Sequence, residues 1–380
     1  MKFNIPVLVL TFLIIPATSM AQRHPKKNLN NLMIGTYTNS GKSQGIYVYS
    51  FNSGTGDFNF RSVARGVENP SYLCLSDDQK FVYAVNEVSN GGVSSFSFNP
   101  DKGELGFLNK VSSMGADPCY ISIDKKNKHV FVGNYSGGNL SAFTILANGA
   151  LSEAVQTIQH SGNSINTNRQ EKPHVHSTVI SPDEQVLFAA DLGTDKINSY
   201  RINNSGEAEI LSATEQNSIL INAGSGPRHL TFHPNGKFAY LIHELTAEVS
   251  VYNYQSGQLN FVQIVSMAPR GYTGGIGAAD IHVSPDGKFL YASNRGDANE
   301  LAIYSVAKDG KLKFAGRQST LGKTPRNFAI SPEGNFLLAA NQNSDEIVIF
   351  KRNKKTGMLT HTGKKIEVGA PVCLMFAKTR

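Results

Sequence analysis

A recurring sequence block constrains the fold of this chain more than any other feature. Each copy contains an alternating apolar segment, a turn of the Ser/His-Pro-Asp/Asn/Glu-Gly type and a second apolar segment that ends near an Asn. Successive copies start 46 to 55 residues apart, a spacing typical of β-propeller blades. Seven copies predict seven blades, and they begin at Pro70, Pro118, Pro173, Pro227, Ala279, Pro325 and Pro371.

Each copy predicts a four-stranded antiparallel sheet. In the copy that begins at Pro227, the turn residues Pro-Asn-Gly-Lys separate two alternating or apolar segments, as in a β-hairpin. Two further strands are expected over residues 248–254 and 259–265, with a second turn around Ser256-Gly257. Sheets repeated around a ring form an all-β propeller, and closing the ring removes exposed sheet edges.

Closure of the ring requires a contribution from both ends of the chain. The copy that begins at Pro371 ends too early to complete a blade, whereas residues 32–37 form a strand-like segment without a preceding partner. We therefore predict that the N-terminal strand pairs with the C-terminal strand and completes the last blade.

Residues 1–21 have the pattern of a signal peptide. Lys2 precedes an apolar run that ends at Ile15, and Ser19 and Ala21 fit the small-residue rule for cleavage between Ala21 and Gln22. The apolar run is too short for a membrane-spanning helix. We expect a periplasmic or secreted protein in which residues 22–380 form one propeller domain without membrane attachment.

Charge and cysteine content exclude several classes of partner. The formal net charge is +7, but the lysines are scattered over predicted turns, so a nucleic-acid partner is not expected. Cys74, Cys119 and Cys373 each lie in the first strand of a copy, which predicts buried free thiols. We expect a monomer that binds a small molecule.

Polar residues recur where the first strand of a blade begins and the second strand ends. Because these strands are antiparallel, the polar residues that begin the first strand and those that end the second strand should meet at one end of the central channel. Convergence of charged groups from several blades favours a ligand site over simple backbone capping. The residues expected there are Tyr135, His174, His176, Arg228, His229, Glu244, Asp280, His282, Arg295, Arg326 and Gln342.

Other sequence features do not indicate a metal, serine-hydrolase or dinucleotide site. The spacing of His174 and His176 suits zinc, but no third ligand is near in sequence, so neither a metal nor another cofactor is predicted. The chain lacks a Gly-x-Ser-x-Gly elbow, and the glycines of residues 271–277 lack the strand-to-helix context of a dinucleotide site. His233 occupies the turn position that Ser fills in other copies, which indicates a structural role.

These residues and motifs resemble the seven-bladed propeller lactonases of the 6-phosphogluconolactonase type, a group that includes a carboxymuconate-cyclising enzyme. The resemblance covers nearly the whole chain that follows the predicted signal peptide. It implies hydrolysis of a sugar-acid lactone, 6-phosphogluconolactone or a related aldonolactone, without an obligatory metal. The matching stretches are Gly35-Thr-Tyr-Thr38, Arg169-Gln170, Pro173-His-Val-His176, Gly226-Pro-Arg-His229, Glu244, Ala278-Ala-Asp-Ile-His282, Asn294-Arg295, Pro325-Arg326 and Asn341-Gln342.

Lactone opening needs a base for the attacking water and positive groups that face the carbonyl oxygen. Glu244 or His176 is the predicted base, and Arg228 with His229 is expected to face the oxyanion. Arg169, Arg295 and Arg326 would hold anionic substrate oxygens, while Asp280 and His282 would orient other groups. The remaining expected substrate contacts are Gln170, His174, Tyr135 and Gln342.

Two alternatives remain open from the sequence. The chain fits an exported propeller that binds proteins or glycans without catalysis, because a fold alone does not specify an activity. It also fits a muconate-type lactonising cyclase, which would use similar side chains. Several Arg, His and acidic groups at the channel mouth favour the hydrolase.

Overall fold

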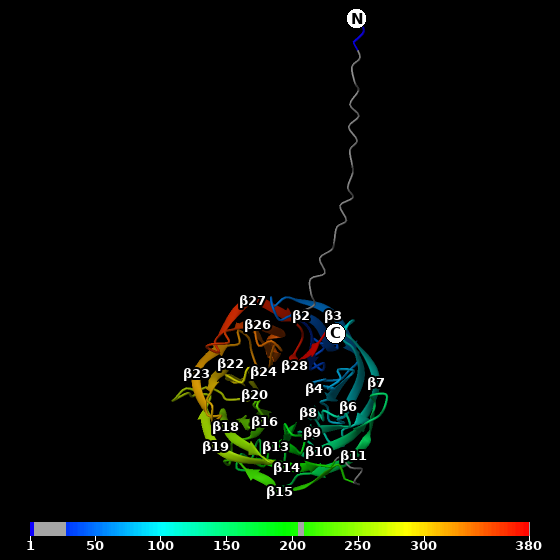
Figure 1. Cartoon of the computed structure of the whole chain (residues 1–380). Coiled ribbons are helices and arrows are strands. Elements are labelled where there is room, and N and C mark those ends of the chain that lie inside the picture. The colour runs from blue at the N-terminus through cyan, green and yellow to red at the C-terminus, as the bar shows by residue number, and fades with distance from the viewer. Residues whose placement is uncertain (4–27, 204–208, 380) are drawn as a thin grey trace.

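The computed structural model describes residues 1–3, 28–203 and 209–379. This part of the chain forms a ring of seven four-stranded antiparallel sheets around a central channel (Figure 1). The prediction of a seven-bladed all-β propeller is therefore confirmed. The predicted cleavage site between Ala21 and Gln22, and all but the first three residues of the predicted signal peptide, lie outside the described residues.

The blades are numbered here in chain order, and their strands are given from the channel outward. Blades 1 to 3 consist of β4 (Leu73–Leu75), β5 (Phe81–Asn86), β6 (Gly92–Asn99) and β7 (Glu104–Ser112); β8 (Pro118–Ile123), β9 (His129–Asn134), β10 (Asn139–Ile145) and β11 (Leu151–Gln159); and β12 (Val175–Ile180), β13 (Val186–Asp191), β14 (Lys196–Ile202) and β15 (Leu211–Leu220).

Blades 4 to 6 follow the same order, and a short 3-10 helix, η1 (Gln342–Ser344), joins β25 to β26. Their strands are β16 (Pro227–Phe232), β17 (Phe238–His243), β18 (Glu248–Gln255) and β19 (Gln258–Ser266); β20 (Ala278–Val283), β21 (Phe289–Asn294), β22 (Glu300–Val306) and β23 (Leu312–Ser319); and β24 (Pro325–Ile330), β25 (Phe336–Asn341), β26 (Glu346–Arg352) and β27 (Leu359–Glu367).

Blade 7 combines the two ends of the described fold. Its strand order is β28 (Pro371–Lys378), β1 (Leu29–Thr36), β2 (Gly45–Asn52) and β3 (Phe58–Arg65). β1 pairs antiparallel with β28 from Asn30 to Thr36, which confirms the predicted closure. Gly35 lies so close to blade 1 that a Cβ atom there would be 2.4 Å from the carbonyl oxygen of Pro70. Only glycine fits this contact without movement of the backbone.

The hydrophobic core is divided into seven clusters, each between two neighbouring blades. The closing strand shows how alternation produces this arrangement. Leu32 and Ile34 pack against blade 6, whereas Met33, on the opposite face of β1, packs against blade 1. All three side chains are fully buried. β1 therefore pairs with β28 and β2 and also contributes side chains to two inter-blade clusters.

The turn between the first two strands of a blade is stabilised by hydrogen bonds of its own side chains. In blade 5, the Ser284 hydroxyl donates to Asp286 at 2.6 Å and accepts from the Phe289 amide at 3.1 Å. In blade 4, His233 replaces the Ser: its Nδ1 accepts from the Asn235 amide at 3.1 Å, and its Nε2 lies 2.9 Å from the Gly287 carbonyl oxygen. These contacts agree with the predicted structural role of His233.

The three cysteines lie in the inner strands of their blades. Cys74, Cys119 and Cys373 are all buried free thiols, as predicted. Among the described residues, there is no helix with the length and apolar character needed to cross a membrane.

Removal of the closing strand should disrupt the whole ring. We predict that deletion of residues 30–37 abolishes cooperative thermal unfolding, because β28 and β2 lose their shared partner and two inter-blade clusters lose side chains. Far-UV circular dichroism during heating measures this. A chain that starts at residue 28 is the control and should unfold in one transition. A deletion variant that unfolds as sharply as this control would contradict the proposed closure.

Candidate active site

The channel mouth is built from the residue that follows the second strand of each blade. Asn86, Asn134 and Asn341 end three of these strands, and their side-chain amides donate to the loop carbonyls of Glu68, Ser113 and Thr320 at 2.9 to 3.0 Å. These bonds hold the backbone from which the next side chain projects. In blades 1 to 7, the next residues are Glu87, Tyr135, Leu192, Glu244, Arg295, Gln342 and Tyr37.

A second set of residues comes from the first strands. Val175 pairs with Asp191 at the end of β13, just as Pro227 pairs with His243 in blade 4. His176 is therefore the counterpart of Arg228, and Cys119 and Arg326 hold the same position in blades 2 and 6. The antiparallel pairing brings the two sets together, as predicted from the sequence.

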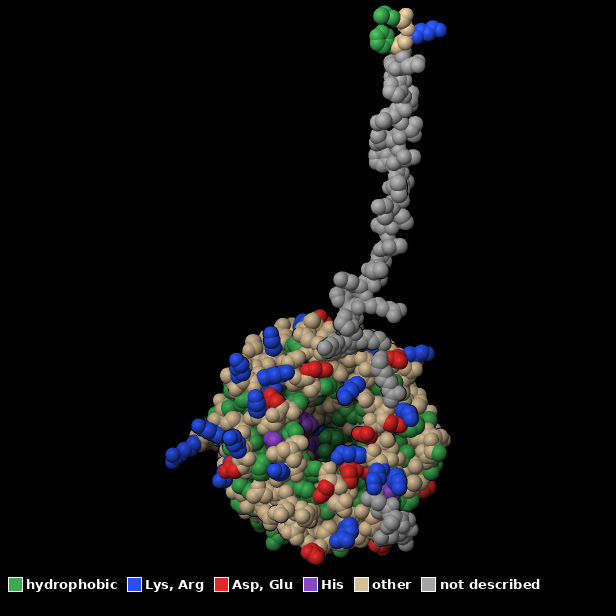
Figure 2. All heavy atoms as spheres, viewed as in Figure 1, with side chains coloured by type: hydrophobic (Ala, Val, Ile, Leu, Met, Phe, Trp, Pro, Cys, Tyr) green, Lys and Arg blue, Asp and Glu red, His purple; other side chains and the backbone are tan. Residues whose placement is uncertain are grey.

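Eight residues of these two sets line a cavity of about 480 Å³ at the mouth of the channel. Figure 2 shows the hollow at the centre of the ring, with histidine side chains at its wall. Six predicted site residues line the cavity: Tyr135, Arg169, His176, Glu244, Arg295 and Arg326. Its other lining residues are Tyr37, Glu87, Cys119, Ile276, Gly277 and Thr324.

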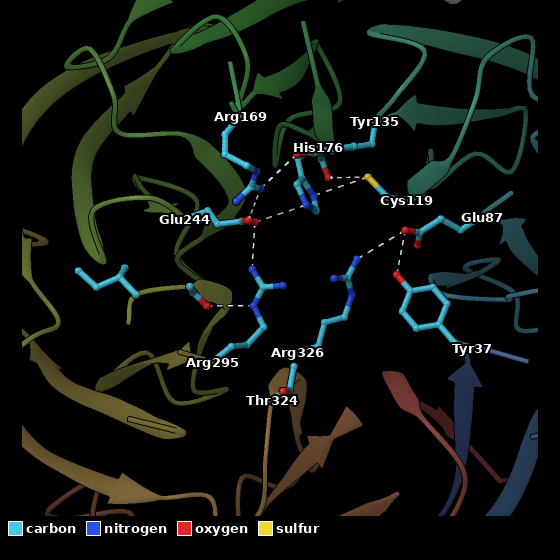
Figure 3. Close-up of a pocket in the computed structure, with 12 residues that line it drawn as sticks. Tyr37, Glu87, Cys119, Tyr135, Arg169, His176, Glu244, Arg295, Thr324 and Arg326 are labelled. Atoms are coloured by element: carbon cyan, nitrogen blue, oxygen red, sulfur yellow. Dashed lines mark hydrogen bonds and ion pairs between the residues drawn. The ribbon is translucent and has the colours of Figure 1, made fainter. Parts of the chain in front are cut away.

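Glu244 is the buried carboxylate to which the arginines converge (Figure 3). Its Oε1 accepts a hydrogen bond from Arg169 Nη2 at 2.6 Å. Its Oε2 accepts one from Arg228 Nε at 2.9 Å and lies 3.1 Å from Arg295 Nη2. Burial favours a higher pKa for Glu244, but Arg295 and Arg228 hold this pKa well below its usual value. Glu244 is therefore ionised at neutral pH and neutralises part of the arginine charge.

His176 is buried beside this cluster and is neutral. Its Nε2 lies 3.8 Å from Glu244 Oε2, and its Nδ1 lies 3.6 Å from Cys119 Sγ (Figure 3). Burial, followed by the positive charge of Arg228, holds the pKa of His176 well below its usual value. An uncharged imidazole at this position has a lone pair with which to accept a proton at neutral pH.

A second charge cluster occupies the opposite wall of the cavity. Tyr37 donates a hydrogen bond to Glu87 Oε1 at 2.8 Å, and Arg326 Nη2 lies 3.7 Å from the same oxygen. The Arg326 guanidinium also lies over the Tyr37 ring, 5.4 Å from its centroid. Glu87 Oε2 is buried and has no hydrogen-bond partner.

Four predicted residues form a linked group outside the cavity lining. Arg228 Nη1 donates to His229 Nε2 at 3.1 Å, and His229 Nδ1 lies 2.9 Å from Asp280 Oδ1. Asp280 Oδ2 in turn lies 2.8 Å from His282 Nε2. Burial and Arg228 lower the pKa of His229 to about 4, so a neutral His229 donates its Nδ1 proton to Asp280. Both ring nitrogens of His229 thus have hydrogen-bond partners. The linked group fixes the position of Arg228 on the side away from the cavity.

Three other predicted substrate contacts have different surroundings. Gln170 is fully buried and donates to the Leu192 carbonyl and to Asp195, both at 2.8 Å. His174 stacks on Tyr135, with ring centroids 4.4 Å apart. Gln342 lines a neighbouring cavity. None of these three side chains lines the cavity around Glu244.

The structure separates the two histidines whose spacing suits zinc. His174 Nδ1 lies 3.0 Å from the Tyr135 carbonyl oxygen and its Nε2 lies 3.2 Å from Glu171, whereas His176 faces Cys119 and Glu244. Within the described part of the chain, no group of three or more His, Cys, Asp or Glu side chains is arranged to hold a metal ion.

Sequence reasoning missed Tyr37, Glu87 and Thr324 as site residues and assigned Cys119 only to the core. A signal for two of them exists. Tyr37 follows the second strand of blade 7 and Glu87 follows that of blade 1, so both occupy the position of Tyr135, Glu244 and Arg295. Blade 1 has a weak copy of the repeat and blade 7 is split between the chain ends, which hides this equivalence in the sequence.

The fold and this site define a propeller of the lactonase class. The family model described as "Lactonase, 7-bladed beta-propeller" matches residues 31–376, and the chain belongs to this family.

Individual relatives match along almost their whole length. A protein of Bacillus subtilis named 6-phosphogluconolactonase is 35% identical over 347 residues, which cover 90% of this chain and 97% of the relative. The solved periplasmic gluconolactonase of Pseudomonas aeruginosa has a TM-score of 0.88 and 39% identity, covering 93% of this chain and 100% of that one. A solved Bacteroides fragilis chain reaches a TM-score of 0.89 at 43% identity, covering 93% and 99%.

His243, the residue before Glu244, should make the fold sensitive to acid. It is fully buried, its Nδ1 has no partner, and burial lowers its pKa to about 4. Between about pH 6.5 and pH 4 the unfolded chain binds a proton that the folded chain does not. Folding stability should therefore fall as the pH falls through this range, by up to about 3 kcal/mol for this residue.

The matched variant is His243→Asn, because Asn occupies this position in four other blades. We predict that the free energy of unfolding falls less between pH 7 and pH 4.5 in the variant than in the wild type. Urea unfolding at both pH values measures this difference. Equal losses in the two proteins would contradict the assignment.

Proposed function

We propose that this protein hydrolyses the lactone ring of a sugar acid in the cavity around Glu244. One observation supports this most directly: three guanidinium groups and one neutral imidazole line the same cavity. The two kinds of group are the ones that ester hydrolysis needs, a proton acceptor for water and positive charge for the oxyanion. The names of the similar proteins from Bacillus subtilis and Pseudomonas aeruginosa also support lactone chemistry.

His176 is the better of the two candidate bases. The pKa values of both groups are held well below their usual values, but the usual pKa of an imidazole lies about 2 units above that of a carboxyl group, so His176 starts as the stronger base and is uncharged at neutral pH. We assign to His176 the removal of a proton from water as its oxygen attacks the lactone carbonyl carbon. The tetrahedral intermediate then collapses, the bond to the ring oxygen breaks, and the proton passes from His176 to that oxygen. The product is an open-chain hydroxy acid.

The positive groups that line the cavity stabilise the developing negative charge. Arg295 and Arg326 are largely buried, and burial lowers the pKa of Arg295 only to about 10, so it keeps its charge at neutral pH. Arg228 lies behind the residues that line the cavity, donates hydrogen bonds to Glu244 and His229, and acts as a positioning residue. Glu244 has the same role, because its carboxylate fixes the guanidinium groups in one arrangement.

The charge of the cavity favours an anionic substrate. Its lining contains three arginines and two carboxylates, Glu87 and Glu244, and Arg228 behind it adds a further positive charge. A phosphorylated or carboxylated sugar lactone would therefore be attracted to the mouth. We further propose that the protein acts after export, which rests on the signal-peptide pattern of residues 1–21 and on a relative described as periplasmic.

Loss of the proposed base should affect the chemical step. We predict that His176→Ala lowers kcat by about a hundredfold to ten-thousandfold on a lactone that the wild type opens. A pH-indicator assay of acid release measures this. Added imidazole should restore part of the rate in the variant and leave the wild type unchanged. Near-normal turnover of the variant would show that His176 is not the base.

Arg169 is the most exposed arginine of the cavity and should bind the anionic group of a charged substrate. We predict that Arg169→Gln lowers kcat/KM more for 6-phosphogluconolactone than for glucono-1,5-lactone, by about tenfold in the ratio. Arg201→Gln removes an equal charge on β14, away from this cavity, and is the control. Equal losses on both lactones in Arg169→Gln would contradict its role as an anion contact.

A further inference from the structure

A second cavity lies beside the proposed catalytic cavity and shares a wall with it. Its volume is about 530 Å³, within the range of small-molecule sites. Tyr37 and Glu87 line both cavities, so these two side chains form the common wall. A ligand that extends from the first cavity past this wall enters the second.

The two cavities differ in charge. The second cavity has one cation, Lys42, against three carboxylates, Glu87, Asp117 and Asp345, which leaves a formal charge of −2. Lys42 is already paired with Asp345 at 2.6 Å. The first cavity, with three arginines against two carboxylates, has a formal charge of +1. A phosphate or carboxylate group is therefore favoured in the first cavity and disfavoured in the second.

The polar groups of the second cavity suit hydroxyl groups. Gln342 and Asn343 make no side-chain hydrogen bond to any other described residue, so both amides present donors and acceptors to a ligand. At the shared wall, Glu87 Oε2 is buried without a partner. An unpaired buried carboxylate oxygen is costly unless a ligand donates to it. A sugar hydroxyl can donate to a carboxylate and both donate to and accept from an amide.

We propose that the second cavity binds a neutral sugar unit attached to the lactone. This inference rests on the proposed lactone hydrolysis and extends it to aldonolactones that carry a second sugar. In this arrangement the lactone ring lies among the arginines, Glu87 accepts from a hydroxyl near the junction, and Gln342 and Asn343 contact the outer sugar. The position of Gln342, predicted from the sequence as a substrate contact, is explained by this subsite.

The test compares lactobiono-1,5-lactone, a gluconolactone that carries a neutral galactose unit, with glucono-1,5-lactone. We expect the wild-type kcat/KM to be about tenfold higher for the disaccharide lactone, the effect of one to three net hydrogen bonds. Asn343→Trp, which fills the second cavity, should lower this ratio about tenfold, and Gln342→Ala should lower it less. The matched control is Asn90→Trp in the corresponding loop of blade 1, which lines neither cavity and should leave the ratio unchanged.

Binding of the open-chain products separates this inference from the proposed function. Isothermal titration should give a tighter Kd for lactobionate than for gluconate in the wild type, and Asn343→Trp should abolish the difference. That binding result supports the subsite even if neither lactone is hydrolysed. Absence of hydrolysis would refute only the proposed function. The opposite outcome is that glucono-1,5-lactone is opened, but the kcat/KM values of the two lactones are equal, the Kd values of the two products are equal, and Asn343→Trp changes neither comparison. This outcome would refute the subsite and leave the proposed hydrolase function standing.

Discussion

The antiparallel pairing of β1 with β28 is the contact on which the rest of this structure depends. It joins segments more than 330 residues apart in the sequence and places Tyr37 beside Glu87 and Arg326. The cavity residues come from all seven blades, and closure brings together those of blades 6, 7 and 1. Because each inter-blade cluster contains side chains of two blades, closure also buries apolar surface that an open array would expose to water.

Charge compensation is the second constraint on the site. Four arginines lie close together near the channel mouth, and such an arrangement is stable only if carboxylates lie among them. Glu244 contacts three of these arginines, and Glu87 lies near the fourth. The same positive field, together with burial, keeps His176 uncharged. Fold stability and the chemistry proposed for the cavity therefore depend on the same ion pairs.

One repeated backbone position supports two different environments in this propeller. The residue after the second strand lines one of the two cavities in six blades, and its identity varies between acid, base, tyrosine and amide, whereas in blade 3 it is the fully buried Leu192. In blades 4 and 5 it contributes to a cavity rich in arginine, whereas in blade 6 it contributes an amide to a cavity rich in carboxylates. The fold provides the positions, and the individual side chains determine which ligand chemistry is favoured at each.

The sequence by itself determined the number of blades, the strands within them and the end of the channel at which polar residues gather. This was possible because turn chemistry and two-residue alternation are local properties, repeated in the chain. Six of the thirteen predicted site residues line the cavity, since antiparallel pairing alone places Glu244, Arg295 and Arg326 at the mouth. Only the tertiary structure decided which side chains are in contact. The salt bridges from Arg169 and Arg295 to Glu244, and the placement of Tyr37 and Glu87 between two cavities, depend on distances between blades, which no local pattern encodes.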